Sequence, residues 1–304
     1  MNAPRYRDPQ ALRQALADRL RPLAKDSGVE LAALQRQFAY DRLLCRVFRT
    51  DPQRWVLKGA TAMLARMQGQ ARHTLDIDLY SRAGDLDEAE QALRRAAAID
   101  LDDFFHFTLR PARPIAQGAG ALRIPITAHL GTIDFARFHV DLVAKLAMTG
   151  TPDEVSPLVP IDLPGLPSTT YRAYPLVDHI ADKVCGLLEL HPRSGGRTES
   201  STRYRDLADL VTLAHTAVVE ATALRVALDS EARRRELSLP DRLEVPSGSD
   251  WPAGYARVAR DAPGLRERGL EEALRSARRF IDPVLVGPAE LRWNPTAMVW
   301  ESQG

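Results

Sequence analysis

Apolar residues recur at helical spacing in the N-terminal part of the chain, and this predicts two or three helices between Pro9 and Phe48. Asp51 and Pro52 then break the pattern. The stretch "RWVLKG" that follows is a short apolar run typical of a buried strand, and residues 60–67 return to helical spacing. The pattern therefore predicts N-terminal helices followed by a strand and a further helix.

The segment "TLDIDLY" alternates strictly between apolar and polar positions, as a strand with one polar face does. Its leucines and isoleucine point one way, whereas Asp76 and Asp78 point the other. An amphipathic helix is predicted from Leu86 to Ile99. Three strands are then predicted in the segments "FFHFTLR", "ALRIPITAHLG" and "IDFARFHVDLVA", and Asp141 lies on the polar side of the last one.

The segment 150–175 contains six prolines, which exclude a regular helix there. It is either a linker or a loop that wraps another element. We place a domain boundary within it, so that residues 1–165 form one domain with the N-terminal helices and residues 166–304 form a mainly helical lobe. Helices are predicted in this lobe at 175–188, 203–219, 221–237 and 264–281.

This order of elements predicts an α+β protein, with a small mixed sheet flanked by helices in the N-terminal half. The composition agrees with a globular chain, because 45% of the residues are apolar and 27% are charged. Cys45 and Cys185 are the only cysteines and are expected to be buried thiols rather than a disulfide framework.

The bulk properties also restrict the partners. No apolar run approaches the roughly 18 residues of a membrane span, and the N-terminus lacks the apolar stretch of a signal peptide. A cytoplasmic protein without a membrane partner is therefore expected. The net charge of +1 confines any nucleic-acid-binding surface to a local patch.

The two aspartates of "TLDIDLY" are candidate metal ligands. Asp76 and Asp78 lie on one side of a strand, roughly 6–7 Å apart, and no Lys or Arg partner for them is visible in the sequence. Carboxylates this close repel each other unless a cation shares them. With Asp141 they could hold two Mg²⁺ or Mn²⁺ ions that position phosphates. Two alternatives are a solvated strand edge and the metal site of a glycosyltransferase.

The strand–helix junction upstream is a candidate phosphate site. Gly59 ends the strand and opens the helix, whose first backbone N–H groups are free to bind phosphate. Thr61 adds a hydroxyl. Lys58 adds a point charge, in a chain that has 41 Lys and Arg residues but only four Lys.

The order strand, glycine at a helix start, D-x-D strand and later aspartate resembles the nucleotidyltransferase fold of the DNA polymerase β superfamily. The segment "WVLKGATAML…RHTLDIDLY" is similar to the signature F-x-L-K-G-G-T-[AS]-L…R-x-[ST]-x-D-[IL]-D-[LF] of AbiEii/MenT-type nucleotidyltransferase toxins. The segment "YPLVDHIADKVCGLLE…RYRDLADLVTL" resembles that family's second block, [HP]-x-x-E-D-K-x-x-A-L…R-x-[KR]-D-x-x-D-[LI]. Together the two blocks span residues 55–213.

The resemblance implies a role for each matching residue. Asp76 and Asp78 match the metal-binding pair, and Asp141 is a looser match by its strand context. The residues expected to bind the nucleotide are Lys58, Gly59, Ala60, Thr61, Arg72, Lys183 and Asp209. Two positions depart from the pattern, because Ala60 replaces its second glycine and Ala181 its glutamate. Ala60 keeps its backbone N–H but loses freedom at positive φ.

Lys183 matches the lysine of the second block, and Asp206 and Asp209 match its two acids. By itself, a lysine beside an apolar stripe usually extends to solvent. The scarcity of lysine and the resemblance favour phosphate binding instead. The two acids share one helix face, where they either complement the helix dipole or act on other groups. We expect Asp206 to orient Lys183 or the attacking hydroxyl, so that this lobe closes the site.

The resemblance implies the toxin of a toxin–antitoxin module. Such an enzyme would use Mg²⁺ or Mn²⁺ to add a nucleotide from an NTP to an RNA acceptor, which we expect to be the 3′ end of tRNA. This would block translation and growth, and a neighbouring gene would encode the antitoxin. Two further alternatives are a non-catalytic NTP-binding or interaction module of the same fold and an enzyme that nucleotidylates protein.

Overall fold

The computed structural model describes residues 6–67, 74–115, 120–144, 147–189, 191–192, 198–199, 202–245, 250–262, 264–287 and 290–302. The chain divides into two compact units. Unit 1 comprises Met1–Gly69, His73–Ala147 and Pro152–Ala173, and unit 2 comprises Gln70–Arg72, Met148–Thr151 and Tyr174–Gly304. The domain boundary predicted after residue 165 falls in the same proline-rich segment as the last change of unit.

Unit 1 is built on a mixed sheet, which is eight-stranded in the described residues. The strand order is β3-β5-β6-β2-β1-β8-β7, and β4 also pairs with β5. Strand β2 runs parallel to β6 and β1 runs parallel to β8, whereas the other pairs are antiparallel. The strands are β1 (Trp55–Lys58), β2 (Asp76–Ser81), β3 (Phe105–Leu109), β4 (Arg113–Pro114), β5 (Ala121–Leu130), β6 (Ile133–Ala144), β7 (Asp153–Val155) and β8 (Tyr171–Ala173).

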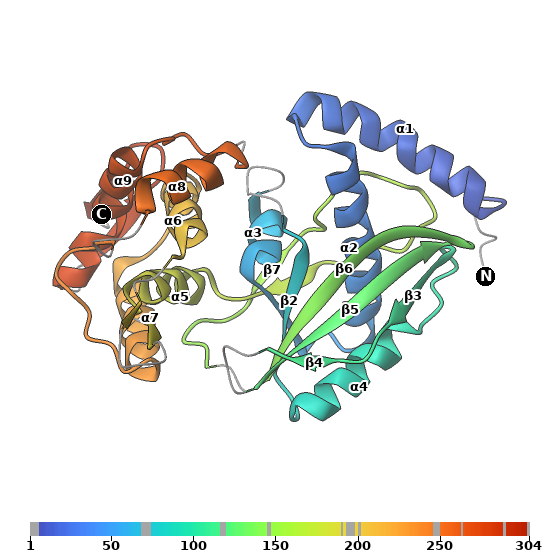
Figure 1. The fold of residues 1–304 in the computed structure, drawn as a ribbon, viewed down its shortest axis with the longest axis horizontal. Coiled ribbons are helices and arrows are strands. Elements are labelled where there is room, and N and C mark those ends of the chain that lie inside the picture. The colour runs from blue at the N-terminus through green and yellow to red at the C-terminus, as the bar shows by residue number, and fades with distance from the viewer. Residues whose placement is uncertain are drawn as a thin grey trace. The chain divides into compact units, whose positions relative to one another are not determined.

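The apolar face of this sheet is covered by helices. Ile77, Ile124 and Val140 are fully buried on it. Helices α2 (Leu31–Thr50) and α4 (Leu86–Ala97) pack against β6, and α1 (Pro9–Ser27) packs on α2 (Figure 1). The Tyr40 ring of α2 meets the Phe138 ring at 4.7 Å. A sheet flanked by helices confirms the predicted α+β fold class.

Buried charges fix α2 to the rest of unit 1. The Arg46 side chain is completely buried and lies 2.7 Å from the Asp103 carboxylate, which also pairs with Arg42. Arg46 donates further hydrogen bonds to the carbonyl oxygens of Ile99 and Phe105. Because each of these charges is paired and hydrogen-bonded, the helix can be buried around them.

The proline-rich segment wraps α2. The segment, all of which the structure describes, contains no regular helix, as its prolines predicted. It forms only the short strands β7 and β8 at its ends. Asp41 of α2 accepts hydrogen bonds from the backbone N–H groups of Leu158 (2.9 Å) and Val159 (3.0 Å). Arg42 donates to the Pro167 carbonyl at 2.7 Å. Of the two alternatives for this segment, the structure therefore shows the wrapping loop.

Unit 2 is mainly helical and is arranged around α6, which packs against α5, α8 and α9. Its buried core includes Trp251, Trp293 and Phe280. The helices are α5 (Leu176–Leu188), α6 (Tyr204–Thr216), α7 (Ala221–Arg234), α8 (Trp251–Arg260) and α9 (Leu270–Val286). Two short hairpins join β9 (His191–Pro192) to β10 (Thr198–Glu199) and β11 (Leu291–Asn294) to β12 (Val299–Ser302).

Helix α8 and the β11–β12 hairpin are absent from the sequence-based prediction, and α9 begins at Leu270 rather than at residue 264. Gly254 lies inside α8, and glycine is a poor helix former. A side chain at this position would meet the Tyr204 ring at 2.4 Å. Tertiary packing therefore requires a residue that local propensity disfavours.

The prediction of buried thiols holds, because both cysteines are free and buried. In the described part of the chain, no helix is long and apolar enough to cross a membrane.

Candidate functional site

The polar face of the unit 1 sheet carries the predicted carboxylates. Asp78 of β2 is the Cα partner of Asp141 on β6 and of Lys58 on β1. Asp141 is in turn the partner of Arg123 on β5. Directly opposed residues point to the same face of a sheet. Arg123, Asp141, Asp78 and Lys58 therefore form a line across four strands, which we call the charged row, and Asp76 lies beside it.

Arg123 binds Asp141 through two parallel hydrogen bonds. Its Nε lies 2.8 Å from Oδ1 and its Nη2 lies 2.6 Å from Oδ2. This hydrogen-bonded contact, together with the charges of Asp76 and Asp78, raises the pKa of Arg123 above its ordinary value. The sequence analysis considered basic partners only for Asp76 and Asp78, and Arg123 pairs with the third carboxylate, Asp141. The signal for Arg123 was its place on the polar side of a strand whose Ile124 faces the core.

Gly59 gives the Asp78 carboxylate its space. Its φ is +57°, in the left-handed region that glycine tolerates best. A Cβ atom on Gly59 would lie 1.7 Å from Oδ2 of Asp78. The lysine–glycine pair at the start of α3 (Gly59–Met67) and the D-x-D strand are thus parts of one packed arrangement.

The next two residues of α3 are buried. Ala60 is helical and is not among the described residues with positive φ, so Gly59 alone meets the backbone requirement at this junction. The Thr61 side chain is fully buried, and its hydroxyl donates to the Asp76 carbonyl oxygen at 2.8 Å. In this structure Thr61 therefore ties α3 to the start of β2. Phosphate binding by Ala60 and Thr61 stays a prediction.

Thr74 is a residue of this site that the sequence analysis did not select. Its hydroxyl donates to the Asp76 carboxylate, and its carbonyl oxygen accepts a hydrogen bond from the Tyr40 hydroxyl at 3.2 Å. The available signal was the Ser/Thr position two residues before the first aspartate of the motif. The predicted nucleotide-binding residue Arg72 lies outside the described residues.

The donor set fits a hard divalent cation, because it consists of carboxylate oxygens on adjacent strands. In the residues that the structure describes, no three His, Cys, Asp or Glu side chains converge closely enough to hold a metal ion. Protein groups already bind carboxylate oxygens of this set, since Thr74 binds Asp76 and Arg123 binds Asp141. The chemistry therefore matches the predicted metal, and these contacts compete with it.

Unit 2 brings together the predicted residues of the second block. Lys183 of α5 lies 2.5 Å from Oδ2 of Asp209 and 3.2 Å from Oδ1 of Asp206, both on α6. The Lys183 and Asp209 side chains are only 5% and 4% exposed. The alternative in which Lys183 extends to solvent is therefore wrong. Convergence of this cluster with the carboxylates of unit 1 stays a prediction.

A second cation borders this cluster. Arg203 lies 3.4 Å from Oδ2 of Asp206, with its side chain 40% exposed. A Cβ atom on Gly186 would approach both Arg203 and Asp206 to within 3.3 Å, so a larger residue there would require these side chains to shift slightly. Asp206, which is 15% exposed, is thus held by Lys183 and Arg203.

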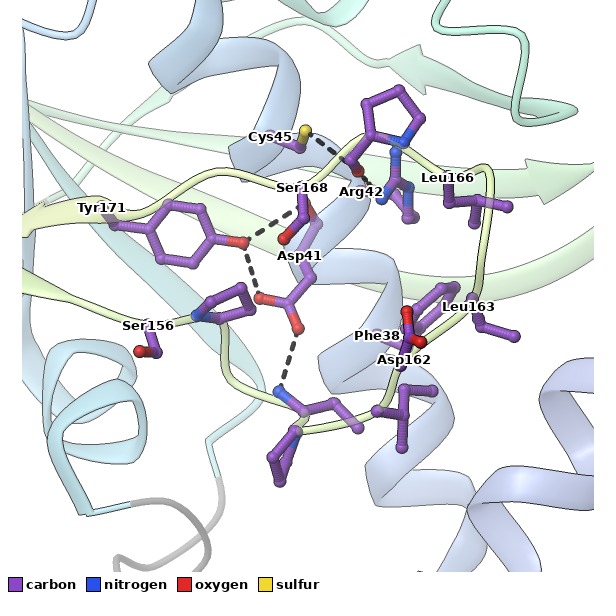
Figure 2. Close-up of a pocket in the computed structure, with 15 residues that line it drawn as sticks. Phe38, Asp41, Arg42, Cys45, Ser156, Asp162, Leu163, Leu166, Ser168 and Tyr171 are labelled. Atoms are coloured by element: carbon purple, nitrogen blue, oxygen red, sulfur yellow. Dashed lines mark hydrogen bonds between the residues drawn. The ribbon is translucent and has the colours of Figure 1, made fainter. Parts of the chain in front are cut away.

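A cavity of about 410 Å³ lies elsewhere in unit 1, between α2 and the wrapping segment (Figure 2). Asp41, Arg42 and Tyr171 line it, together with apolar and proline side chains. Figure 2 shows the Asp41 carboxylate between the Tyr171 hydroxyl, which donates at 2.8 Å, and the backbone of the wrapping segment. Burial raises the pKa of Asp41 to about 6. Because protein partners bond these polar groups, we assign them to holding the segment in place.

The sequence matches the family of nucleotidyl transferase AbiEii toxins of type IV toxin–antitoxin systems over residues 42–279. It matches none of the curated proteins significantly. MenT4, a nucleotidyltransferase toxin from Mycobacterium tuberculosis H37Rv, is similar in structure with a TM-score of 0.49 and 17% identity, over 88% of this chain and 99% of MenT4. A candidate nucleotidyltransferase from H. pylori gives 0.45 and 16%, over 83% and 96%.

Proposed function

This chain belongs to the AbiEii family of nucleotidyltransferase toxins of type IV toxin–antitoxin systems, and on that premise we propose that it transfers a nucleotide from an NTP to an RNA acceptor. The observation that carries the proposal is the polar sheet face, where Asp76, Asp78 and Asp141 lie on adjacent strands and Asp78 lies against the glycine that opens α3. This arrangement combines carboxylates for a cation with a helix start for phosphate. The glycosyltransferase alternative is excluded by family membership.

In this proposal Asp76, Asp78 and Asp141 hold Mg²⁺ or Mn²⁺. The cation supplies positive charge next to the phosphates when it is bound. Lys58 adds a further positive charge beside Asp78, and the backbone N–H groups at the start of α3 bind phosphate oxygens. The charged row is thus the nucleotide-binding part of the site.

The cluster of Lys183, Asp206 and Asp209 supplies the second part. The acceptor hydroxyl attacks the α-phosphorus of the NTP, and Asp206 accepts the hydroxyl proton as general base. If Asp206 only orients the hydroxyl, the proton passes to solvent water instead. The bond to the β-phosphate breaks, and pyrophosphate leaves. Lys183 is held by both acids and neutralises phosphate charge in this step. Asp209 keeps Lys183 in position.

We further propose that the acceptor is the 3′ end of tRNA, which implies a cytoplasmic reaction that stops translation. Membership of a type IV toxin–antitoxin family supports a cognate antitoxin protein encoded by a neighbouring gene. We take RNA rather than protein as the acceptor because the resemblance of the two sequence blocks to this toxin family implies it. An experiment must therefore distinguish nucleotide transfer to RNA from two other outcomes. These are nucleotide transfer to protein and NTP binding without turnover.

The decisive experiment is incubation of the protein with each labelled NTP, Mg²⁺ or Mn²⁺ and total tRNA. We expect label in tRNA with at least one NTP, and none with Asp78→Asn, which keeps the shape of the side chain. Label in protein would replace the RNA acceptor by a protein one. NTP binding without label in either would show a non-catalytic module.

Growth provides an independent readout. Expression of the wild-type chain is expected to stop growth. Expression of Asp78→Asn at the same protein level is expected to leave growth unaffected. Growth arrest by both chains would separate toxicity from the proposed site.

A further inference from the structure

We propose that Arg123 is an internal counter-ion of the carboxylate site, which a divalent cation replaces at Asp141. This inference rests on the proposed function, because it concerns the same three carboxylates. It adds a positioning residue outside the two sequence blocks, since Arg123 lies on β5, between the motif strand β2 and Asp141 in the sequence.

Arg123 and a divalent cation would bind the same atoms of Asp141. Both oxygens of Asp141 accept a hydrogen bond from the guanidinium, at 2.8 and 2.6 Å. A hard cation would bind these same oxygens. The bidentate pair is also a strong interaction, because donor and acceptor are both charged. Binding at Asp141 therefore requires that Arg123 yield at least one oxygen.

Among the described residues, Asp141 is the hydrogen-bonding partner that holds the Arg123 side chain. This side chain is 45% exposed. Arg46 of the same unit shows the contrast, since it is fully buried and bonded to Asp103 and to several carbonyl oxygens. Asp141 is only 12% exposed. The arginine can therefore swing into solvent while the carboxylate stays in place.

The charge of Arg123 also offsets the electrostatic repulsion between the carboxylates. Asp141 and Asp78 are neighbours across β6 and β2, and adjacent carboxylates repel each other unless a cation is present. Arginine remains protonated at all physiological pH values. Arg123 thus supplies a permanent charge that offsets the repulsion before a metal arrives. A divalent ion supplies more charge and can contact several carboxylates at once.

The test is Mn²⁺ affinity, measured by calorimetry and by electron paramagnetic resonance on the full chain. Removal of the competing guanidinium in Arg123→Gln should tighten Mn²⁺ binding by about fivefold, the scale of a partly exposed ion pair. The matched control is Arg137→Gln. Arg137 lies on the same face of β6 as Asp141, but it is 75% exposed and pairs with Asp134 rather than with Asp141. It removes the same charge and should change the affinity less than about twofold.

Thermal denaturation gives the second readout. Without metal, Arg123→Gln should melt below wild type, and Mn²⁺ should raise its melting temperature more than that of wild type. If this variant does not fold, Arg123→Lys keeps the charge but loses the bidentate geometry, and it should bind Mn²⁺ with intermediate affinity.

Equal or weaker Mn²⁺ binding by Arg123→Gln, with wild type binding normally, would overturn the counter-ion role alone. Arg123 would then be a fixed support of Asp141. Absence of Mn²⁺ binding in every variant would overturn the proposed metal site itself, and the exchange with it. An equal gain in Arg137→Gln would show a general charge effect and would also overturn the proposal.

Discussion

At the scale of the residue, Gly59 determines where the Asp78 carboxylate can lie. It combines a positive φ with an approach that leaves no room for a Cβ atom. The sequence identified this glycine through the resemblance and through the helix start. It did not reveal the contact, because Asp78 reaches Gly59 only when β1 and β2 pair in the observed register.

Gly59→Ala should therefore displace the Asp78 carboxylate and abolish transfer. The positive φ alone costs about 1–2 kcal/mol for a residue with a Cβ atom. Thermal melting and label incorporation into tRNA measure the two effects. Ala60→Gly is the control, since residue 60 is helical, and it should keep its activity. Full activity of Gly59→Ala would contradict the role of this contact.

Lys183 illustrates a residue whose environment differs from its usual one. It is buried against Asp209 and Asp206, so removal of its charge leaves two acids without their shared cation. Lys183→Met should lower the free energy of unfolding by about 3–5 kcal/mol, the cost of breaking a buried pair.

The double variant Lys183→Met/Asp209→Leu should recover part of this loss, because the uncompensated buried charge is gone. Denaturant unfolding of wild type, both single variants and the double variant gives the coupling. Additive effects would mean that the two side chains do not stabilise each other.

At the scale of the element, alternation along the strands predicts most of the unit 1 sheet. Ile77 and Asp78 face opposite sides because they are consecutive residues of a strand, and Ile77 is apolar because its side of the sheet is buried under α2 and α4. The strand order does not follow from alternation, because β2 lies between β1 and β6 and the pairs are distant in the sequence. Arg123 was missed for a different reason, since its contact with Asp141 depends on the exact register of the adjacent strands β5 and β6, which shifts between Ala128 and His129.

The wrapping segment gives a prediction for pH. Burial raises the pKa of Asp41 from 3.8 to about 6, against the opposing effect of hydrogen bonds from Leu158, Tyr171 and Val159. Between these values the folded chain keeps a proton that the unfolded chain releases. Stability therefore falls as pH rises through this window, and the effect levels off above it.

Asp41→Asn cannot lose this proton. The stability of wild type relative to Asp41→Asn should thus fall by on the order of 2 kcal/mol between about pH 4 and pH 7. Denaturant unfolding at several pH values measures the difference. A difference that stays constant or grows with pH would contradict a raised pKa at Asp41.

At the scale of the whole molecule, the predicted site residues divide between the two units. Asp76, Asp78 and Asp141 belong to unit 1, whereas Lys183 and Asp206 belong to unit 2. The sequence predicted Asp76, Asp78, Lys183 and Asp206 because they lie in local motifs, and it predicted Asp141 from its strand context. In the proposed reaction the carboxylates of unit 1 and the Lys183 cluster of unit 2 act on the same nucleotide, and this is tested on the intact chain.

Asp206→Asn separates the two contributions. It should leave Mn²⁺ affinity within about twofold of wild type, because binding is assigned to unit 1, and should lower transfer at least about a hundredfold, as for loss of an acid–base group. Calorimetry and label incorporation measure the two quantities. Transfer at the wild-type rate would remove Asp206 from the reaction.

The wrapping segment also determines when the enzyme can become active during synthesis. Asp41 and its partner Leu158 are separated by 117 residues, and β1 pairs with β8 only once Ala173 has been made. Contacts between such distant positions form slowly, since long loops must close first. Asp76 and Asp78 leave the ribosome well before strands β7 and β8, which complete their sheet, and Asp141 precedes these strands by a shorter stretch. A nascent toxin therefore carries its acidic residues for some time before it has the folded core that aligns them.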